Sequence, residues 1–291
     1  MNLLTFDIEE WYLNQQKSGP AEKYAEYDRY LDAILNKLDE RGFKATFFCV
    51  GEMGKSFPEV IRKIKSRGHE IGCHSNIHTW LNKMTVAECR EDTHQAVDSL
   101  EQCIGEKVKS YRAPAFSIGE SNKWAFEVLT ENGIERDASI FPAARDFGGF
   151  KNFGQKELCI VEYNGIRLKE FPVCTTQIMG KEMAYSGGGY FRFFPLSFVK
   201  KEMKKSKYAM CYFHLGDLLP ESAKVKTKEE YEAYYKEKGS LKARYVRYIK
   251  TNLGKKNAFD KMMQLIDSMA FVGLQQADGA IEWNNVSVVN I

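Results

Sequence analysis

The segment that decides the fold reads HEIGCHSNIH, residues 69–78. It is a short apolar run that ends in His74, and a second histidine, His78, follows four residues later. On a helical turn, side chains four residues apart share a face, so two imidazoles can converge on one metal ion. The same spacing also occurs without a metal, with one ring packed and the other solvated. Ser75 stands where HExxH metalloproteases carry their glutamate, so this is not their motif.

Four further segments repeat the pattern of an apolar run that ends in polar residues. They read LLTFDIEEW (3–11), YRAPAF (111–116), DASIFP (137–142) and CYFHLGD (211–217). Stretches of helical periodicity separate them, and alternating strands and helices predict a parallel sheet. In such folds, functional groups collect at the carboxyl ends of the strands. We therefore expect one site to combine Asp7, His74, Arg112, Asp137 and His214.

In their order and content, these five segments resemble the polysaccharide deacetylase family, the NodB-homology group of carbohydrate esterases. The resemblance extends from Leu3 to Asp217. It implies an α/β fold, a distorted (β/α)7 barrel, and a hydrolase that removes acetyl groups from N-acetylated sugars of a polysaccharide or its precursor. The tail from Lys224 onward resembles extensions on bacterial members linked to surface-polysaccharide synthesis.

We expect a catalytic domain at residues 1–223 and a helical C-terminal extension at 224–291 packed on the barrel. An insertion is expected at about 143–194. Within it, Asn164-Gly165 separates two apolar runs, which predicts a β-hairpin beside the barrel. The glycines at 187–189 lack the GK[ST] of a phosphate-binding loop, so they predict a flexible or closely packed loop near the site.

A metal site needs more than two histidines, and the resemblance implies a carboxylate from the first segment. The common family pattern TFDDG becomes TFDIE here, with Ile8 in place of the second aspartate. Alternate residues of a strand point to the same side, which puts Glu9 on the side of Asp7. We expect Glu9 to join the histidine pair, with Glu10 as the alternative. One divalent metal is expected, and Zn²⁺ suits imidazole and carboxylate ligands.

The resemblance also implies the residues that move protons. Asp7 is expected to act as general base, and Arg112 to pair with it and lower its pKa. His214 is expected to act as general acid, because imidazolium releases a proton near neutral pH. Asp137 is expected to hold the His214 ring.

Substrate contacts are implied at four positions. The backbone N–H of Ala115 would stabilise an oxyanion, Phe116 would wall the pocket, and Leu215 would line the space for the acetyl methyl group. Trp80 would stack on a sugar ring, although packing in the interior is an equal expectation for it.

Composition narrows the partners. Lys and Arg total 42 against 39 Asp and Glu, and a net charge of +3 argues against nucleic-acid binding. No apolar run approaches the roughly 20 residues that span a bilayer. The seven cysteines include no CxxC pair and no secretory signal is visible. We therefore expect buried free thiols and a cytoplasmic location.

Three questions stay open at this point: the reaction, the form of the substrate and the role of the basic tail. The same machinery would also hydrolyse a small non-sugar amide, and the missing second aspartate would suit a glycan-binding homologue that has lost catalysis. The substrate is expected to be an acetylated carbohydrate, free or linked to a carrier. Basic residues of the tail, among them Arg244 and Arg247, form either a solvated face or a contact to an anionic carrier group such as phosphate.

Overall fold

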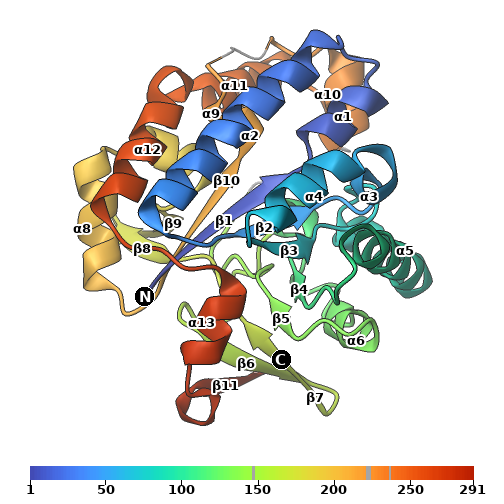
Figure 1. The fold of residues 1–291 in the computed structure, drawn as a ribbon, viewed down its shortest axis with the longest axis vertical. Helices are drawn as coiled ribbons and strands as arrows, with labels where there is room; N and C mark the ends of the chain where they lie inside the picture. Colours follow the sequence, from blue (N-terminus) through green and yellow to red (C-terminus); the bar gives the residue numbers. More distant parts are fainter. Residues whose placement is uncertain (146–147, 221–223, 236) are drawn as a thin grey trace.

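The computed structural model describes residues 1–145, 148–220, 224–235 and 237–291 (Figure 1). Its centre is a sheet of nine strands in the order β10-β1-β2-β3-β4-β5-β7-β6-β11, parallel except for the β6–β7 pair. These strands are β1 (Asn2–Ile8), β2 (Thr46–Cys49), β3 (Glu70–Cys73), β4 (Ser110–Tyr111), β5 (Arg136–Asp137), β6 (Cys159–Tyr163), β7 (Ile166–Glu170), β10 (Ala209–His214) and β11 (Ser287–Asn290). A separate antiparallel pair consists of β8 (Thr175–Ile178) and β9 (Lys181–Ala184).

Helices alternate with the first strands and cover the outside of the sheet (Figure 1). The helices are α1 (Glu10–Gln16), α2 (Glu22–Arg41), α3 (Met53–Ser56), α4 (Pro58–Ser66), α5 (Val86–Ile104), α6 (Ala125–Glu131), α7 (Gly188–Phe193), α8 (Leu196–Lys205), α9 (Leu215–Leu218), α10 (Lys228–Tyr235), α11 (Leu241–Asn252), α12 (Ala258–Ser268) and α13 (Leu274–Ala280). The predicted mostly parallel α/β fold is confirmed. No helix in the described part of the chain is long and apolar enough to cross a bilayer.

Local signals explain the helices that the sequence predicts. Helix α2 buries an apolar stripe and ends at Gly42, whose φ of 64° suits a residue without a side chain. Helix α5 begins with a capping box, since Thr85 accepts a hydrogen bond from the Glu88 backbone and the Glu88 carboxylate accepts one from the Thr85 backbone.

The strand register explains why distant polar residues meet. Strand β1 lies between β10 and β2, and every residue from Leu3 to Ile8 is buried. Asp7 pairs with His214 across the β1–β10 ladder. Cys73 pairs with Tyr111, so His74 and Arg112 leave their strands at the same level. All four side chains therefore emerge at one edge of the sheet.

The seam between the β7 end and β10 carries side-chain bridges. Cys174 Sγ donates to the Tyr208 carbonyl at 3.6 Å and accepts from the Met210 N–H at 3.1 Å. The Tyr208 hydroxyl donates to the Pro172 carbonyl at 2.9 Å. No ladder joins β7 to β10 within the described strands, so closure into a seven-stranded barrel stays a prediction.

The predicted hairpin is confirmed, with Asn164 and Gly165 at φ 47° and 82° in its turn. Its position differs from the expectation, because β7 pairs with β5 and the hairpin is part of the main sheet. Strand β11 then pairs with β6, so the C-terminal segment adds a strand as well as helices. The boundary between a catalytic domain at 1–223 and an extension at 224–291 stays a prediction.

Candidate active site

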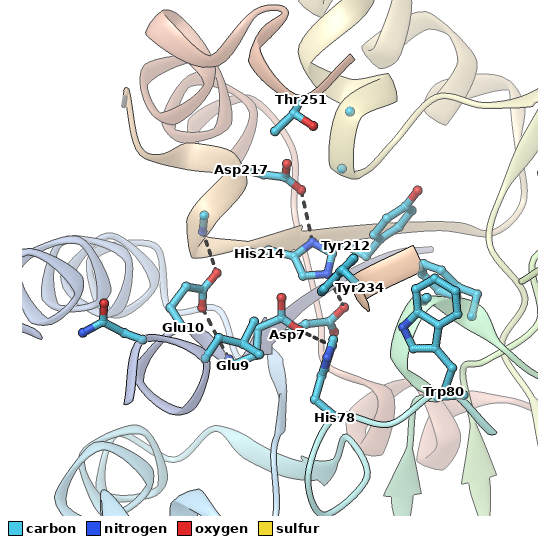
Figure 2. Close-up of a pocket in the computed structure, with 18 of the residues that line it drawn as sticks. Asp7, Glu9, Glu10, His78, Trp80, Tyr212, His214, Asp217, Tyr234 and Thr251 are labelled. Atoms are coloured by element: carbon cyan, nitrogen blue, oxygen red, sulfur yellow. Dashed lines mark hydrogen bonds and ion pairs between the residues drawn. The ribbon is translucent and has the colours of Figure 1, made fainter. Parts of the chain in front are cut away.

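A cavity of about 540 Å³ opens at the carboxyl ends of β1 and β10 (Figure 2). Its polar lining includes Asp7, Glu9, His78 and His214, while aromatic walls come from Trp80, Phe116, Tyr190, Tyr212 and Tyr234. The glycine-rich segment before α7 also reaches it through Gly188 and Gly189. A side chain at Gly187 would collide with the Tyr212 ring, since its Cβ would lie 2.3 Å from Cδ1. That part of the loop is therefore closely packed.

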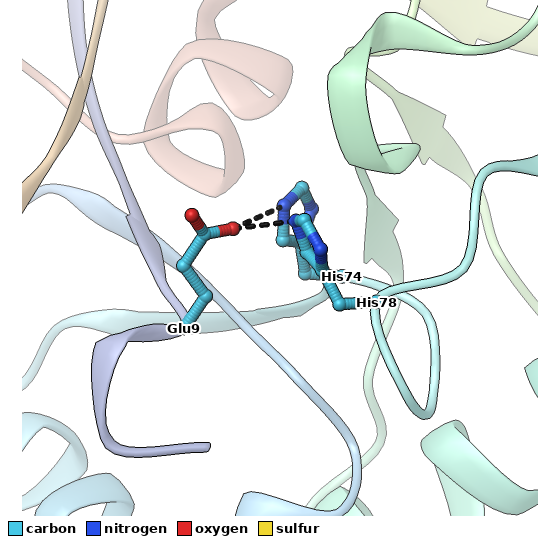
Figure 3. Close-up of side chains that lie close together, drawn as sticks. All are labelled: Glu9, His74 and His78. Atoms are coloured by element: carbon cyan, nitrogen blue, oxygen red, sulfur yellow. Dashed lines mark ion pairs between the residues drawn. The ribbon is translucent and has the colours of Figure 1, made fainter. Parts of the chain in front are cut away.

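Glu9, His74 and His78 form a cluster that we call the metal cluster (Figure 3). Glu9 Oε2 lies 2.6 Å from His78 Nε2 and 3.6 Å from His74 Nε2. One ligand atom from each residue lies within 4.8 Å of the other two. The expected helical turn is wrong, because residues 74–78 form a loop after β3 with positive φ at Ser75 and His78. The two rings nevertheless converge, with centroids 5.3 Å apart.

Unsatisfied polar atoms indicate that these residues fit a cation. His74 Nε2 is buried and makes no hydrogen bond to the described residues, while Glu9 Oε2 is buried and faces the two imidazole nitrogens. Buried polar atoms without partners are uncommon unless an ion or water completes them. His74 Nδ1 lies 2.7 Å from the Arg112 carbonyl, which favours the tautomer that leaves the Nε2 lone pair pointing into the cluster. Two imidazoles and one carboxylate form a ligand set that suits Zn²⁺.

The two adjacent glutamates point in different directions. Glu10 turns to α9, where its Oε1 accepts the Gly216 N–H at 2.5 Å, and it lies outside the metal cluster (Figure 2). Burial and the neighbouring Glu9 charge raise the pKa of Glu10 to about 7. Burial also opposes ionisation of Glu9, but the nearby His78 and His214 outweigh it and hold the pKa of Glu9 well below its usual range.

A second cluster, which we call the proton-transfer cluster, comprises Asp7, Arg112, His214 and Asp217. Arg112 Nη1 donates to Asp7 Oδ1 at 2.7 Å, and both side chains are buried. Burial by itself would raise the pKa of Asp7, but Arg112, together with His74 and His214, lowers it below the usual value. Asp7 Oδ2 lies 3.3 Å from His214 Nε2. The structure thus joins the predicted base and the predicted acid.

Asp217 is the residue that the sequence analysis missed. Its Oδ2 lies 3.1 Å from His214 Nδ1, and its Oδ1 lies 3.2 Å from Arg192. The His214 ring keeps 28% of its surface exposed. Burial opposes the charged ring, but the carboxylates of Asp217, Glu9 and Asp7 raise the pKa of His214 to about 10. His214 is therefore an imidazolium at neutral pH.

The expectation that Asp137 holds His214 requires correction. Asp137 is fully buried and accepts a hydrogen bond from the Ser139 hydroxyl at 2.5 Å, while both ring nitrogens of His214 face other carboxylates. The signal for Asp217 was its position three residues after His214 in CYFHLGD. Helix α9 begins at Leu215, so residues 214 and 217 lie one turn apart.

Of the four predicted substrate-binding residues, three line the cavity: Trp80, Ala115 and Phe116. Ala115 has a φ of 55°, and its carbonyl accepts a hydrogen bond from Arg145 at 2.8 Å. Leu215 is fully buried and is not among the lining residues. Trp80 is also largely buried, because it packs with Tyr231 and Tyr235 of α10.

Known proteins resemble this chain in both halves. Residues 3–136 match the family model described as polysaccharide deacetylase, and residues 138–278 match a domain of unknown function, DUF3473. A peptidoglycan-N-acetylglucosamine deacetylase from Bacillus cereus is 37% identical over 95 residues, 32% of this chain and 34% of the relative. A chitooligosaccharide deacetylase from Sinorhizobium fredii is 30% identical over 98 residues, 33% of this chain and 43% of the relative.

A solved structure extends the likeness over the whole chain. The crystal structure of a proposed polysaccharide deacetylase from Mycobacterium smegmatis has a TM-score of 0.61 and 16% identity, covering 100% of this chain and 92% of the other. At this identity the likeness establishes a shared fold. The chain spans only about a third of the length of the first curated relatives. Residues 3–136, a little under half of the chain, therefore resemble the polysaccharide deacetylase family, and the chain shares its fold with the structure from Mycobacterium smegmatis.

Proposed function

We propose that the protein is a metal-dependent hydrolase that removes acetyl groups from N-acetylated sugars of a polysaccharide or its precursor. The observation that carries this proposal is the meeting of two clusters at one cavity. Glu9 and His78 line that cavity from the metal cluster, and Asp7 and His214 line it from the proton-transfer cluster. The names of the relatives, which include deacetylases of peptidoglycan and of chitooligosaccharide, support the choice of substrate class.

Each cluster has a separate part in the proposed reaction. A divalent ion held by Glu9, His74 and His78 would polarise the acetyl carbonyl and make bound water more acidic. Asp7 is kept ionised by Arg112 and accepts a proton from the attacking water. His214 is charged and donates a proton to the departing nitrogen. The Ala115 N–H is the proposed donor to the oxyanion.

The position of Glu9 favours catalysis over an inactive glycan-binding homologue. The chain lacks the second aspartate of TFDDG, but Glu9 brings a carboxylate oxygen to the histidine pair. Glu9 is one carbon longer than the aspartate of the common pattern and lies one residue later in the chain. We propose that it takes the place of that aspartate as a metal ligand.

Acetate release tests the proposal. We expect the purified protein to release acetate from N-acetylated chitooligosaccharides or peptidoglycan fragments, and a chelator or Asp7→Asn to abolish the release. His94→Ala is a suitable histidine control, because His94 lies on the exposed side of α5. Full activity of the Asp7→Asn protein would remove the proposed base. A panel that includes cyclic ureides would identify a small non-sugar amide as the substrate instead.

We also propose Zn²⁺ as the metal, a reducing compartment as the location and a carrier-linked sugar as the substrate. All seven cysteines are buried free thiols, which suits a reducing environment. Metal analysis of the purified protein identifies the ion.

A further inference from the structure

A second cavity, of about 350 Å³, adjoins the active-site cavity and shares Lys17, Tyr234 and Thr251 with it. We call it the basic cavity. Among the described residues, its charged lining consists of Lys17, Lys224, Lys226, Arg244, Arg247 and the carboxylate of Glu230. The cations come from the end of α1, the segment before α10, and α11, so three separate parts of the chain converge on one space.

Within the described parts of the chain, four of these five cations form no ion pair with a carboxylate. Among residues 1–145, 148–220, 224–235 and 237–291, no ion pair joins Lys17, Lys224, Lys226 or Arg244 to a carboxylate. Arg244 Nη1 donates to the Lys226 carbonyl at 3.1 Å, while its Nε is buried and makes no hydrogen bond there. The carboxylate of Glu230 is engaged in accepting the Thr227 N–H at 2.8 Å.

Repulsion between these cations supports an anion as the missing partner. Desolvation by the surrounding walls and the ammonium of Lys226 together lower the pKa of Lys17, although Lys17 remains exposed to solvent. Lys63, by contrast, lies 2.9 Å from the carboxylate of Asp32. Like charges gathered in one cavity oppose one another, and an anion between them removes that repulsion.

The basic cavity is held in a fixed place beside the reacting centre. Helix α10 packs through Tyr231 and Tyr235 against Trp80, which lies in the segment after the histidine pair. The Tyr234 ring lies 6.2 Å from the Trp80 ring, edge to face. Tyr234 and Thr251 line both cavities, and Figure 2 shows them among the residues of the active-site cavity. A ligand could therefore extend from the metal cluster into the basic cavity.

We infer that the basic cavity binds a phosphate or diphosphate group attached to the acetylated sugar whose acetamido group enters the active site. The described lining offers five cationic side chains and one carboxylate. Such a lining suits a ligand with more than one negative charge better than a ligand that carries a single carboxylate. The inference rests on the proposed function for the sugar, and the anion site itself does not. A nucleoside diphosphate and a lipid diphosphate share this chemistry.

Calorimetric titration of the full-length protein with inorganic pyrophosphate tests the anion site without any turnover. We expect Lys226→Gln and Arg244→Gln each to weaken binding about tenfold, as for the loss of one charge-assisted hydrogen bond. Lys242→Gln is the matched control, because it removes the same charge from α11. Lys242 is exposed and does not line the cavity. Equal binding by all variants, or equal weakening by the control, would overturn the inference. If pyrophosphate binds at the metal cluster instead, all variants will bind it equally.

Kinetics then identify the source of the phosphate. We expect Arg244→Gln to raise KM for UDP-N-acetylglucosamine or for a polyprenyl-diphosphate-linked N-acetylglucosamine in micelles, and to leave KM for N,N′-diacetylchitobiose unchanged. The substrate with the larger rise is the source. If no sugar releases acetate while pyrophosphate binding still responds to the variants, the proposed function fails and the anion site stands. If acetate is released and neither KM nor pyrophosphate binding responds, the anion site fails alone.

Discussion

The two clusters of the active site differ in how their polar atoms are satisfied. In the metal cluster, His74 Nε2 is buried without a hydrogen bond to the described residues, and Glu9 Oε2 faces only the two imidazoles among the ion pairs of the described residues. In the proton-transfer cluster, Asp7 has Arg112 and His214 as partners, and His214 has a carboxylate at each ring nitrogen. The first cluster is arranged to receive something the chain does not supply, whereas the second is complete by itself.

This difference separates binding from proton transfer within one cavity. Buried polar atoms without partners oppose folding, so their presence is explained if a bound cation repays the loss. Paired groups instead fix protonation states, with Asp7 ionised and His214 charged. The variants below therefore affect metal content or proton transfer, and few should affect both.

The largest effect is expected from His74→Ala. It removes one of the three proposed metal ligands, so we expect both the metal content and the activity to collapse. Loss of several kcal/mol of metal-derived stabilisation corresponds to a decrease in kcat/KM of about 10³-fold or more. Elemental analysis and acetate release measure the two quantities, with His94→Ala as the control. A His74→Ala protein that kept its metal would show that the ion lies elsewhere.

A smaller effect is expected from His214→Gln. Removing a general acid lowers kcat by about 10²–10³-fold, within the range for such groups. Because His214 lies outside the metal cluster, we expect the metal content to stay at the wild-type value. Parallel loss of metal and activity would mean that the two clusters are one functional unit.

Asp217→Asn should shift the pH dependence as well as the rate. Asp217 is the leading group that raises the pKa of His214, so its replacement lowers that pKa. Activity that needs imidazolium is lost as pH rises through this pKa, and the alkaline limb should therefore move to lower pH. Near neutral pH we expect about a tenfold loss of kcat. A cation bound beside Glu9 would weaken the effect of Glu9 on the pKa of His214 equally in the wild type and in the variant. The shift is therefore measured relative to the wild type. If the alkaline limb does not move, Asp217 does not raise the pKa of the general acid.

Much of the fold could be predicted because its signals are local. Helix α2 has a periodic apolar stripe and a terminal glycine, and the β6–β7 turn has Asn164-Gly165. Pairings between distant segments carry no such signal. That β7 would pair with β5, and β11 with β6, depends on which edges remain open after the other strands have assembled.

The site was predictable where strand ends decide position and less so where a turn does. Asp7, His74, Arg112 and His214 meet because parallel strands end at one edge. The partner of His214 instead depends on α9 beginning directly after β10, which favours Asp217 over Asp137. The loop from His74 to His78 brings the two imidazole rings together through positive φ angles at Ser75 and His78. A rule based on helical spacing does not anticipate this conformation.

The smallest effect concerns the adjacent glutamates and is expected in stability. Glu10 has a pKa of about 7 in the folded protein against its usual 4.5, so ionisation favours the unfolded chain as pH rises between these values. Glu10→Gln keeps an acceptor for the Gly216 N–H and removes this penalty. With a chelator present, we expect its melting temperature to exceed that of wild type by a few degrees above pH 7 and to match it below pH 4.5.

Glu9→Gln is the control of opposite sign. The pKa of Glu9 is lowered, so its ionised form stabilises the fold and its loss should lower the melting temperature at neutral pH. Two variants that shifted in the same direction would contradict the separation between a carboxylate poised for a cation and its neighbour that faces α9.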